Sequence, residues 1–390
     1  MPIFRTSTRL LIAVGLVVCV LAIDLAQRVV TKPAAAALPS LVPQGTALTA
    51  LRTGGGFIPM PPDAAAAHAS NLLAMPASSG AALTAFWFAG DRESAPNVQI
   101  AASQFDRATQ QWLTPKYVVN RHTMGAQLGA GIRRIGNPVA WTDGSGRMHL
   151  FVVATGLGGW AAGRILHTVQ SRAGQGLTEL EFAPLRTLPL SWLWNTSYLV
   201  RSAPLPLEDG GMVLPAYFEL GIKFPVALRF DRVGNFVGME RMSQRKFLLQ
   251  PTLIATGPGD WLALLRDNRR DGRVAVARTS DAGAHWSDAE SLPLVNPDAA
   301  IAGLSLSPTH QVLVHNTSPH SRALLDLSAS ADGLNWSRLA VLEQGTDADE
   351  YSYPALAWAD GSLWVSYTDH RTRIAWQRFH VGGAGPQGKP

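Results

Sequence analysis

Short apolar runs recur along this chain at a nearly even spacing, and this recurrence limits the possible folds more than any other feature. Successive runs begin roughly 45 to 65 residues apart, and each lies near a turn signal such as Asp143-Gly144 or Asp360-Gly361. The runs occupy residues 83–88, 148–154, 211–217, 261–265, 311–315 and 362–367. Six such units predict an all-β, six-bladed β-propeller, in which four-stranded blades bury their faces against their neighbours.

The composition agrees with this fold class and argues against several functions. The chain is 47% hydrophobic and 16% charged and contains 36 Gly and 26 Pro, as expected of a turn-rich β protein. Its net charge of +5 is spread along the sequence, so we expect no nucleic-acid partner. The histidines lack metal-ligand spacing and no glycine-rich phosphate loop is present, so we expect no metal and no cofactor.

The N-terminus has the pattern of an export segment. Arg5 and Arg9 precede an apolar run over residues 10–23, which is shorter than the roughly 20 residues of a membrane-spanning helix. We assign residues 1–30 to a signal peptide or signal anchor. Residues 31–56 are rich in Ala, Pro, Gly and Thr and are expected to form a flexible linker, followed by the propeller over residues 57–385. The protein is therefore expected in the periplasm or outside the cell, with a tether to the inner membrane as the alternative to cleavage.

An eight-residue motif marks one of the predicted turns. Residues 279–286 read TSDAGAHW, which matches the Asp-box template of Ser or Thr, x, Asp, x, Gly, x, x, Trp, and residues 330–336 carry a shorter copy, SADGLNW. In such a turn the Asp accepts backbone N–H bonds, the Gly supplies a positive φ and the Trp packs into the blade. We therefore interpret Asp281 and Asp332 as turn-forming residues and not as catalysts.

From about residue 68 to residue 379 the chain resembles the BNR-repeat, sialidase-like family of bacterial glycoside hydrolases. The resemblance rests on an ordered series of segments: residues 86–93 (FWFAGDRE), 136–139 (GNPV), 214–219 (LPAYFE), 249–251 (LQP), 264–267 (LLRD) and 350–354 (EYSYP). Sialidases hold the substrate carboxylate with three arginines and attack with a tyrosine, because a neutral phenol approaches an anionic sugar without charge repulsion. The resemblance implies the same fold and a related activity for this chain.

The resemblance also assigns roles to individual residues. Arg266 and Arg322 match the second and third substrate-binding arginines, and Arg92 is a further candidate for the pocket. Tyr351 matches the nucleophile. Glu219 and Lys223 flank a predicted turn, where they form either an exposed salt bridge or a polar clamp on a sugar hydroxyl.

Three positions depart from the family pattern. His68 stands where the first arginine is expected, Asn97 where the acidic loop residue is expected, and Gln250 where the glutamate that assists the tyrosine is expected. A missing general acid lowers the rate by roughly two to four orders of magnitude for a poor leaving group. The carboxylates available as substitutes are Glu350, Glu219, Asp267 and Glu93.

These residues leave three functions open. The first is an exported, exo-acting glycoside hydrolase that acts on sialic acid or a related acidic terminal sugar. The second is a non-catalytic propeller that binds glycans or assembles envelope components, which Asn97 and Gln250 favour because each is the amide of a required carboxylate. The third is a lyase or intramolecular transferase acting on sialic acid in the same pocket.

Overall fold

The chain forms two compact units, residues 1–34 and residues 35–390, in a computed structural model that describes residues 8, 10–19, 33–43, 47–269 and 272–383. In the first unit, residues 10–19 are helical and their side chains are exposed. No helix within the described ranges is both long and apolar enough to cross a membrane. The export segment remains a prediction.

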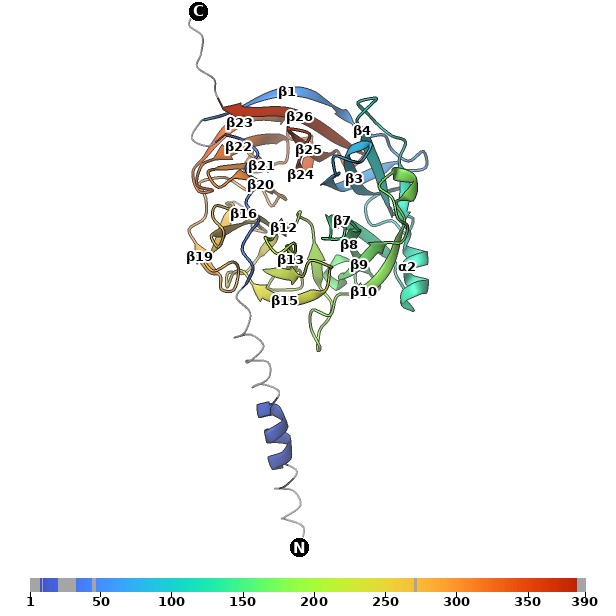
Figure 1. Cartoon of the computed structure of the whole chain (residues 1–390), viewed down its shortest axis with the longest axis vertical. Helices are drawn as coiled ribbons and strands as arrows, with labels where there is room; N and C mark the ends of the chain where they lie inside the picture. Colours follow the sequence, from blue (N-terminus) through green and yellow to red (C-terminus); the bar gives the residue numbers. More distant parts are fainter. Residues whose placement is uncertain (1–7, 9, 20–32, 44–46, 270–271, 384–390) are drawn as a thin grey trace, which may run out of the picture. The chain divides into compact units, whose positions relative to one another are not determined.

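The described residues between 48 and 383 form a six-bladed β-propeller, as the spacing of the apolar runs predicted (Figure 1). Each blade is an antiparallel sheet, and its strands run outward from the central axis in chain order, except that β1 is the outermost strand of blade 6. Blade 1 contains β2 (Ala66–Ala74), β3 (Ala81–Gly90), β4 (Gln99–Asp106), β5 (Gln111–Trp112) and β6 (Lys116–Val119), and blade 2 contains β7 (Arg134–Thr142), β8 (Met148–Thr155), β9 (Arg164–Gln170) and β10 (Phe182–Thr187). Blade 3 contains β11 (Tyr198–Val200), β12 (Leu205–Pro206), β13 (Met212–Phe218), β14 (Phe224–Phe230) and β15 (Phe236–Arg241).

The remaining three blades complete the ring. Blade 4 contains β16 (Leu248–Ala255), β17 (Trp261–Asp267), β18 (Ala275–Thr279) and β19 (Ser287–Ala289). Blade 5 contains β20 (Ala302–Ser307), β21 (His310–Asn316), β22 (Leu324–Ser330) and β23 (Trp336–Gln344). Blade 6 contains β24 (Tyr351–Ala359), β25 (Ser362–Asp369), β26 (Arg373–Gly383) and β1 (Leu48–Phe57). Between blades 1 and 2 the chain forms the helix α2 (Arg121–Leu128), and two short 3₁₀ turns lie at η1 (Trp160–Ala162) and η2 (Leu177–Glu179).

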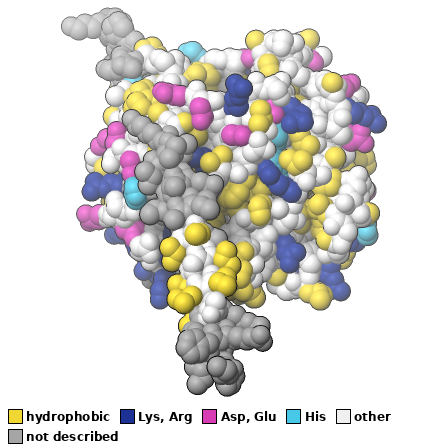
Figure 2. Space-filling view, turned by 60° about the horizontal axis from the view of Figure 1, so that its bottom comes forward, with side chains coloured by type: hydrophobic (Ala, Val, Ile, Leu, Met, Phe, Trp, Pro, Cys, Tyr) yellow, Lys and Arg dark blue, Asp and Glu magenta, His cyan; other side chains and the backbone are white. Residues whose placement is uncertain are grey.

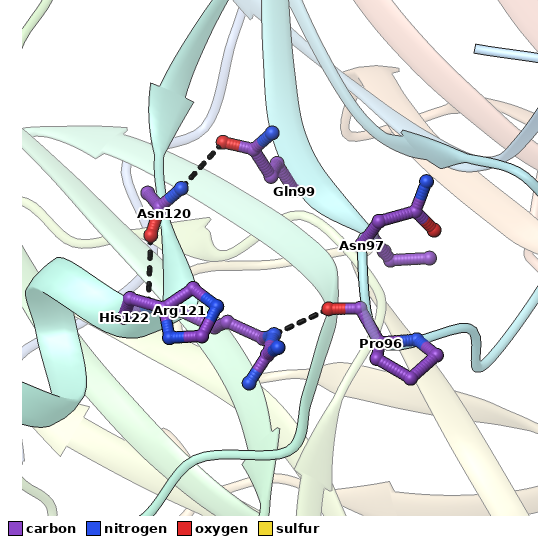
Figure 3. A pocket seen from close by; sticks show the side chains of 7 residues that line it. Pro96, Asn97, Gln99, Asn120, Arg121 and His122 are labelled. Carbon is purple, nitrogen blue, oxygen red and sulfur yellow. Dashed lines mark hydrogen bonds between the residues drawn. The ribbon is translucent and has the colours of Figure 1, made fainter. Parts of the chain in front are cut away.

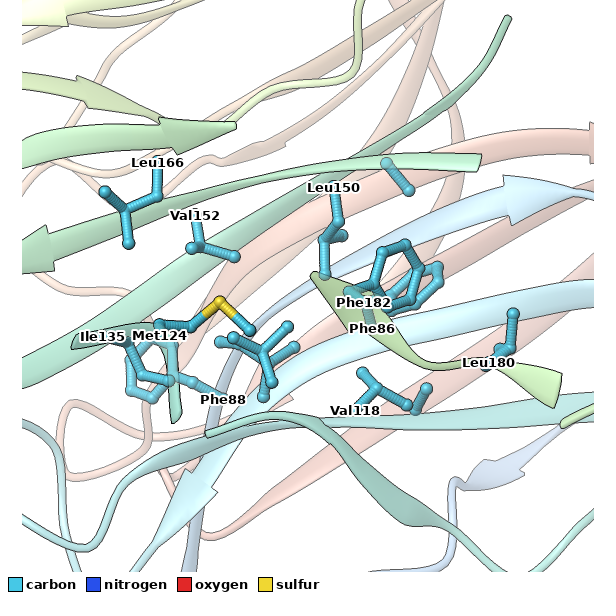
Figure 4. Packing of buried hydrophobic residues seen from close by; sticks show 14 of the residues in the cluster. Phe86, Phe88, Val118, Met124, Ile135, Leu150, Val152, Leu166, Leu180 and Phe182 are labelled. Carbon is cyan, nitrogen blue, oxygen red and sulfur yellow. The ribbon is translucent and has the colours of Figure 1, made fainter. Parts of the chain in front are cut away.

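The apolar runs of the sequence are the second strands of the blades. Every residue of β3, β8, β17 and β21 is buried, because these strands are covered on both faces by neighbouring blades. Figure 4 shows one such interface, where Phe86 and Phe88 of blade 1 pack with Leu150 and Val152 of blade 2. A strand that is buried on both faces has no polar side to alternate with, which explains the continuous apolar runs.

The prediction of a flexible linker over residues 31–56 is wrong for its second half. Residues 48–57 form β1, which pairs with β26 and joins the two ends of the propeller within blade 6. The exposed outer strand of a blade buries few side chains, so β1 left no apolar pattern in the sequence.

Residues 35–42 also contact the propeller. The amide of Ala36 donates to the carbonyl of Pro258 at 2.8 Å, and the amide of Leu41 donates to the carbonyl of Leu306 at 2.8 Å. Both acceptors lie where innermost strands end. We call that side of the propeller the box face, because the two Asp-box turns also lie there, and we call the other side, where the innermost strands begin, the site face.

Four innermost strands share a backbone irregularity near the site face. The strand register shifts in β2, β7, β16 and β24, and each shift contains a non-glycine residue with positive φ. These residues are Ala69 (54°), Asn137 (47°), Gln250 (45°) and Tyr353 (53°). Such conformations cost about 1–3 kcal/mol each and cluster at functional sites. Bulges also redirect side chains, so this ring of bulges marks the place to search for the site.

Candidate active site

Tyr353 lies at the centre of a cluster of polar side chains from five of the six blades. Its ring centre is 4.2 Å from that of His68 in blade 1, and the guanidinium carbon of Arg201 in blade 3 lies 5.2 Å from it. The side-chain nitrogen of Gln250 in blade 4 donates to the Tyr353 hydroxyl at 3.5 Å and to the Tyr217 hydroxyl at 3.3 Å. Arg322, in blade 5, is close enough to act on the phenol electrostatically.

The Tyr353 phenol differs from the other five tyrosines of the chain. Burial raises its pKa, but the positive charge of Arg266, the hydrogen bond from Gln250 and the charge of Arg322 outweigh burial, so its pKa lies below the ordinary value of 10. The pKa is raised for each of the others, which are Tyr117, Tyr198, Tyr217, Tyr351 and Tyr367. Tyr353 is therefore the tyrosine whose surroundings favour ionisation of the phenol.

Gln250 assists this ionisation through its orientation. Arg266 Nη1 donates to the amide oxygen of Gln250 at 2.8 Å, which leaves the amide nitrogen facing the two phenol oxygens. An N–H donor stabilises a phenolate, whereas a carboxylate at this position would take up the phenol proton. Gln250 thus presents a hydrogen-bond donor to the two phenol oxygens, where a glutamate would present only acceptors.

His68 is a neutral, buried part of this cluster. It is 2% exposed, and neither ring nitrogen has a hydrogen-bond partner among the described residues. Burial lowers its pKa well below 6.5, and the charges of Arg371, Arg201, Arg322 and Arg266 lower it further. An imidazole in these surroundings supports the Tyr353 ring as an uncharged group and cannot replace the missing arginine as a cation.

Two of the predicted arginines belong to ion-pair networks. Arg266 Nε donates to Asp298 Oδ1 at 2.7 Å. Arg322 Nη1 donates to Glu350 Oε1 at 3.1 Å, and Arg371 donates to both oxygens of Glu350 at 2.9 and 3.0 Å. Burial raises the pKa of Glu350, but these two guanidinium groups lower it below its ordinary value. Glu350 is thus an ionised anchor for arginines, and it is a poor general acid.

Arg201 was not predicted, and it is the most isolated cation of the site. It is 3% exposed, its Nη2 donates to the carbonyl of Pro354 at 2.8 Å, and its Nε has no partner among the described residues. Burial lowers its pKa to about 10, and the nearby groups that favour its charged form are the phenols of Tyr353 and Tyr217. Its positive charge therefore interacts with these two phenols and not with a carboxylate among the described residues.

Glu219 has the opposite character to Glu350. It lies just after β13, and its carboxylate is 3.7 Å from the ammonium group of Lys223, which also donates to Asn268 Oδ1 at 2.6 Å. Burial raises the pKa of Glu219 above its ordinary value, and Lys223 and Arg266 offset only part of this effect. Burial therefore shifts this carboxyl toward its protonated form, which is the direction that general-acid catalysis requires.

The structure places Tyr351 outside this cluster, which corrects its assignment as the nucleophile. The Tyr351 ring packs against Tyr367 and His370 instead, at centre-to-centre distances of 6.4 and 5.4 Å. In a regular strand, residues 351 and 353 would point to the same side. The bulge in β24 separates them and turns Tyr353 toward His68 and Gln250.

Other predicted residues also lie apart from the cluster. Asp267 is 1% exposed and binds Arg269, with its Oδ1 2.8 Å from the arginine Nε. Arg92 is exposed, whereas the neighbouring Glu93 reaches the site through an ion pair with Arg371. These contacts make Asp267 a local structural residue and give Glu93 a part in the network.

Asn97 is exposed and lines a separate cleft of about 270 Å³ between the β3–β4 connection and the start of α2 (Figure 3). Its side-chain oxygen accepts from the amide of Asp91 at 3.3 Å. Asn120 caps α2 by accepting from the amide of His122 at 2.8 Å and donates to Gln99 at 2.8 Å, so the cleft wall is held by local bonds. The described residues contain no group of three His, Cys, Asp or Glu arranged to hold a metal.

The basic residues do not form one patch over the visible surface. Figure 2 shows Lys and Arg side chains scattered among acidic and apolar ones. The concentration of guanidinium groups around Tyr353 is not matched by a continuous basic patch on this face.

Comparisons with known proteins agree with the fold. Residues 81–365 match the family model described as a BNR repeat-like domain. The Hadza microbial sialidase Hz136 aligns with a TM-score of 0.65 at 16% identity, covering 82% of this chain and 66% of that one. The NanB sialidase from Streptococcus pneumoniae aligns with a TM-score of 0.62 at 11% identity, covering 85% and 70%. A Dyadobacter fermentans protein described as of unknown function aligns with a TM-score of 0.63 at 12% identity, covering 86% and 99%.

These alignments have limits in length and identity. The chain spans just under two thirds of the Hadza sialidase, and it spans 59% of the Trypanosoma rangeli sialidase solved with sialic acid. At these identities the structures establish the fold alone. A comparison with curated protein sequences gave no match.

Proposed function

Because this chain belongs to the family of proteins with a BNR repeat-like domain, we propose that it is an exported, exo-acting glycoside hydrolase of sialidase type. Its substrate is sialic acid or a related acidic terminal sugar. The observation that carries the proposal is Tyr353, the one tyrosine whose pKa the fold lowers, held among arginines at the propeller axis.

The charge balance of the site supports an acidic substrate. Four arginines lie close enough to His68 to lower its pKa. Among the described residues, Arg266 pairs with Asp298, Arg322 pairs with Glu350, and Arg371 pairs with Glu350 and Glu93. Arg201 is left without a carboxylate. An excess of buried positive charge favours an anionic ligand, because arginine matches a carboxylate with two parallel hydrogen bonds.

The proposed reaction proceeds by two displacements. The Tyr353 phenolate oxygen bonds to the anomeric carbon while the bond from that carbon to the leaving oxygen breaks, and the leaving oxygen takes the proton of Glu219. A water molecule then displaces Tyr353 from the anomeric carbon and gives a proton to the Glu219 carboxylate. Two displacements at one carbon retain its configuration. Arg266, Arg322 and Arg201 stabilise the phenolate before attack and after release.

A hydrolysis panel with the purified chain tests this function. The substrates are aryl glycosides of sialic acid, of other acidic sugars and of neutral sugars, and the matched variants are Tyr353→Phe and Tyr351→Phe. We expect turnover of an acidic class that Tyr353→Phe abolishes and Tyr351→Phe leaves intact. Turnover that survives Tyr353→Phe, or that is confined to neutral sugars, would overturn the proposal.

A second candidate is a propeller that binds acidic glycans without hydrolysing them. It is favoured by Gln250 and Asn97, which carry amides where the family carries carboxylates, and by the ion pairs that hold Glu350 ionised. Saturable binding of a sialyl oligosaccharide without product, weakened by Arg266→Met, would support this candidate against the hydrolase.

A further inference from the structure

Six large apolar side chains are exposed on chain connections at the site face that begin or end in blade 3. They lie on three chain connections: the one between β10 and β11, the one between β13 and β14, and the one between β15 and β16. The six residues, which we call the apolar rim, are Trp192 (95% exposed), Leu193 (76%), Trp194 (52%), Leu220 (42%), Ile222 (44%) and Phe247 (42%).

Backbone hydrogen bonds join the three connections to one another. The amide of Glu219 donates to the carbonyl of Ser197 at 2.8 Å, which links the first connection to the second. The amide of Phe247 donates to the carbonyls of Ile222 and Lys223, each at 3.0 Å, which links the second to the third. The apolar rim is thus a single feature built from segments that are distant in the sequence.

The fold holds the tip of this rim in place. The side-chain oxygen of Asn195 accepts from the amides of Leu190 and Ser191 at 2.9 and 3.3 Å. The amide of Trp194 donates to the Ser191 hydroxyl at 3.0 Å, and its indole N–H donates to Ser197 at 3.3 Å. These bonds fix a turn that presents Trp192 and Leu193 to solvent. Large apolar side chains held exposed on a fixed turn lose contact with water when a partner covers them, so this turn is a candidate interaction surface.

The charges beside the rim indicate the kind of partner. The segments that carry it contain three basic residues, Lys223, Arg245 and Lys246, and one acidic residue, Glu219, which is paired with Lys223. Tryptophan and leucine flanked by basic residues are the combination found where proteins enter a lipid headgroup region. Basic residues near an anionic membrane add electrostatic attraction to it.

We propose that the apolar rim docks the site face of the propeller onto an anionic lipid bilayer surface. Trp192 and Leu193 enter the headgroup region, and Arg245 and Lys246 lie over the lipid phosphates. Glu219 and Tyr217 belong to the same strand end as Leu220, so docking brings the active site to the lipid surface. The interaction does not depend on hydrolysis, because no residue of the rim takes part in the proposed reaction.

Hydrogen exchange of the full-length chain tests this surface directly. The probe is a vesicle made of equal parts phosphatidylcholine and phosphatidylglycerol, compared with a vesicle of phosphatidylcholine alone. We expect slower exchange in residues 190–197 and 219–223 with the anionic vesicle. The triple variant Trp192→Ser, Leu193→Ser, Trp194→Ser should remove this protection and weaken vesicle binding about tenfold or more, which corresponds to about 1.4 kcal/mol or more.

A matched variant controls for loss of apolar surface in general. Val233 and Leu334 are exposed on the box face at 45% and 44%, so Val233→Ser with Leu334→Ser should leave the protection unchanged. Unprotected rim segments in the presence of bound vesicles would overturn the proposal, since binding would then come from elsewhere in the chain. Protection that depends on protein concentration without vesicles would also overturn it, because it would identify a second copy of the chain as the partner.

Discussion

The guanidinium carbon of Arg201 lies 5.2 Å from the ring centre of Tyr353, and no carboxylate of the described residues pairs with it. We therefore expect Arg201→Met to raise the pKa of Tyr353 by about one unit or more, because a buried positive charge that favours the phenolate is lost. Ultraviolet absorbance of the phenolate, recorded during a pH titration, measures this shift without any substrate.

Two variants control this titration. Tyr353→Phe should remove the lowest-pH phenolate transition, since the pKa of every other tyrosine is raised. Arg201→Lys keeps the charge and should keep the transition close to its original position. If Arg201→Met leaves the transition where it was, Arg201 has no part in activating the phenol.

Replacing Glu219 by glutamine tests the general acid. The raised pKa of Glu219 favours its protonated form, whereas the amide of glutamine has no acidic proton to give. We expect kcat on alkyl glycosides to fall by about 10²–10⁴, and much less on aryl glycosides with a good leaving group, because only a poor leaving group needs protonation. Equal losses on both substrate types would exclude Glu219 from this role, and Asp267→Asn is the comparison outside the site.

The second Asp box should support stability and not turnover. Asp332 accepts from the amides of Leu334 and Asn335 at 2.8 and 2.7 Å and from the Ser330 hydroxyl at 2.9 Å. Asp332→Ala leaves these donors without their acceptor, so we expect a loss of about 1–3 kcal/mol in the free energy of unfolding. Chemical denaturation measures the loss, and Asp332→Asn should recover part of it. A fall in kcat at temperatures where the variant is folded would contradict a purely structural role.

Acid should destabilise the propeller well before its carboxylates are protonated. Burial lowers the pKa of His167 from 6.5 to about 3, with a further contribution from His149, and burial lowers that of His315 to about 4. Below pH 6.5 the unfolded chain therefore binds protons that the folded chain does not, and stability falls as the pH drops toward these values. Urea midpoints across this range measure the slope.

The histidine contribution can be isolated by substitution. His167→Gln removes one of these protonation sites and should make the decline between pH 6.5 and 3 less steep, whereas exposed His380→Gln should not change it. An unchanged slope in His167→Gln would show that the acid sensitivity comes from other groups.

The blades could be predicted from the sequence because their second strands are buried on both faces. The strand β1 could not, since it lies at the outer edge and its partner β26 is more than 300 residues away in the chain. Its residues LTALRTGGGF carry little apolar pattern and three consecutive glycines. The composition of residues 48–57 is typical of a linker. The segment is a strand because its backbone pairs with β26.

Only some residues of the candidate site could be predicted from the sequence. Arg266, Arg322, Gln250 and His68 were found through the family resemblance, and the structure brings them together. The resemblance pointed to Tyr351, whereas the structure places Tyr353 in the cluster, because a bulge and not the strand periodicity decides which side chain faces the axis. A signal was present: Asn137, Gln250 and Tyr353 each precede a proline and each have positive φ. Arg201 belongs to no such motif, and only its burial beside Tyr353 reveals it.

The hydrogen bonds of Ala36 and Leu41 to Pro258 and Leu306 hold this segment against the box face of the propeller. Pro258 lies just after the innermost strand of blade 4, and Leu306 lies in the innermost strand of blade 5. The segment therefore fastens two neighbouring blades to each other on the side opposite Tyr353.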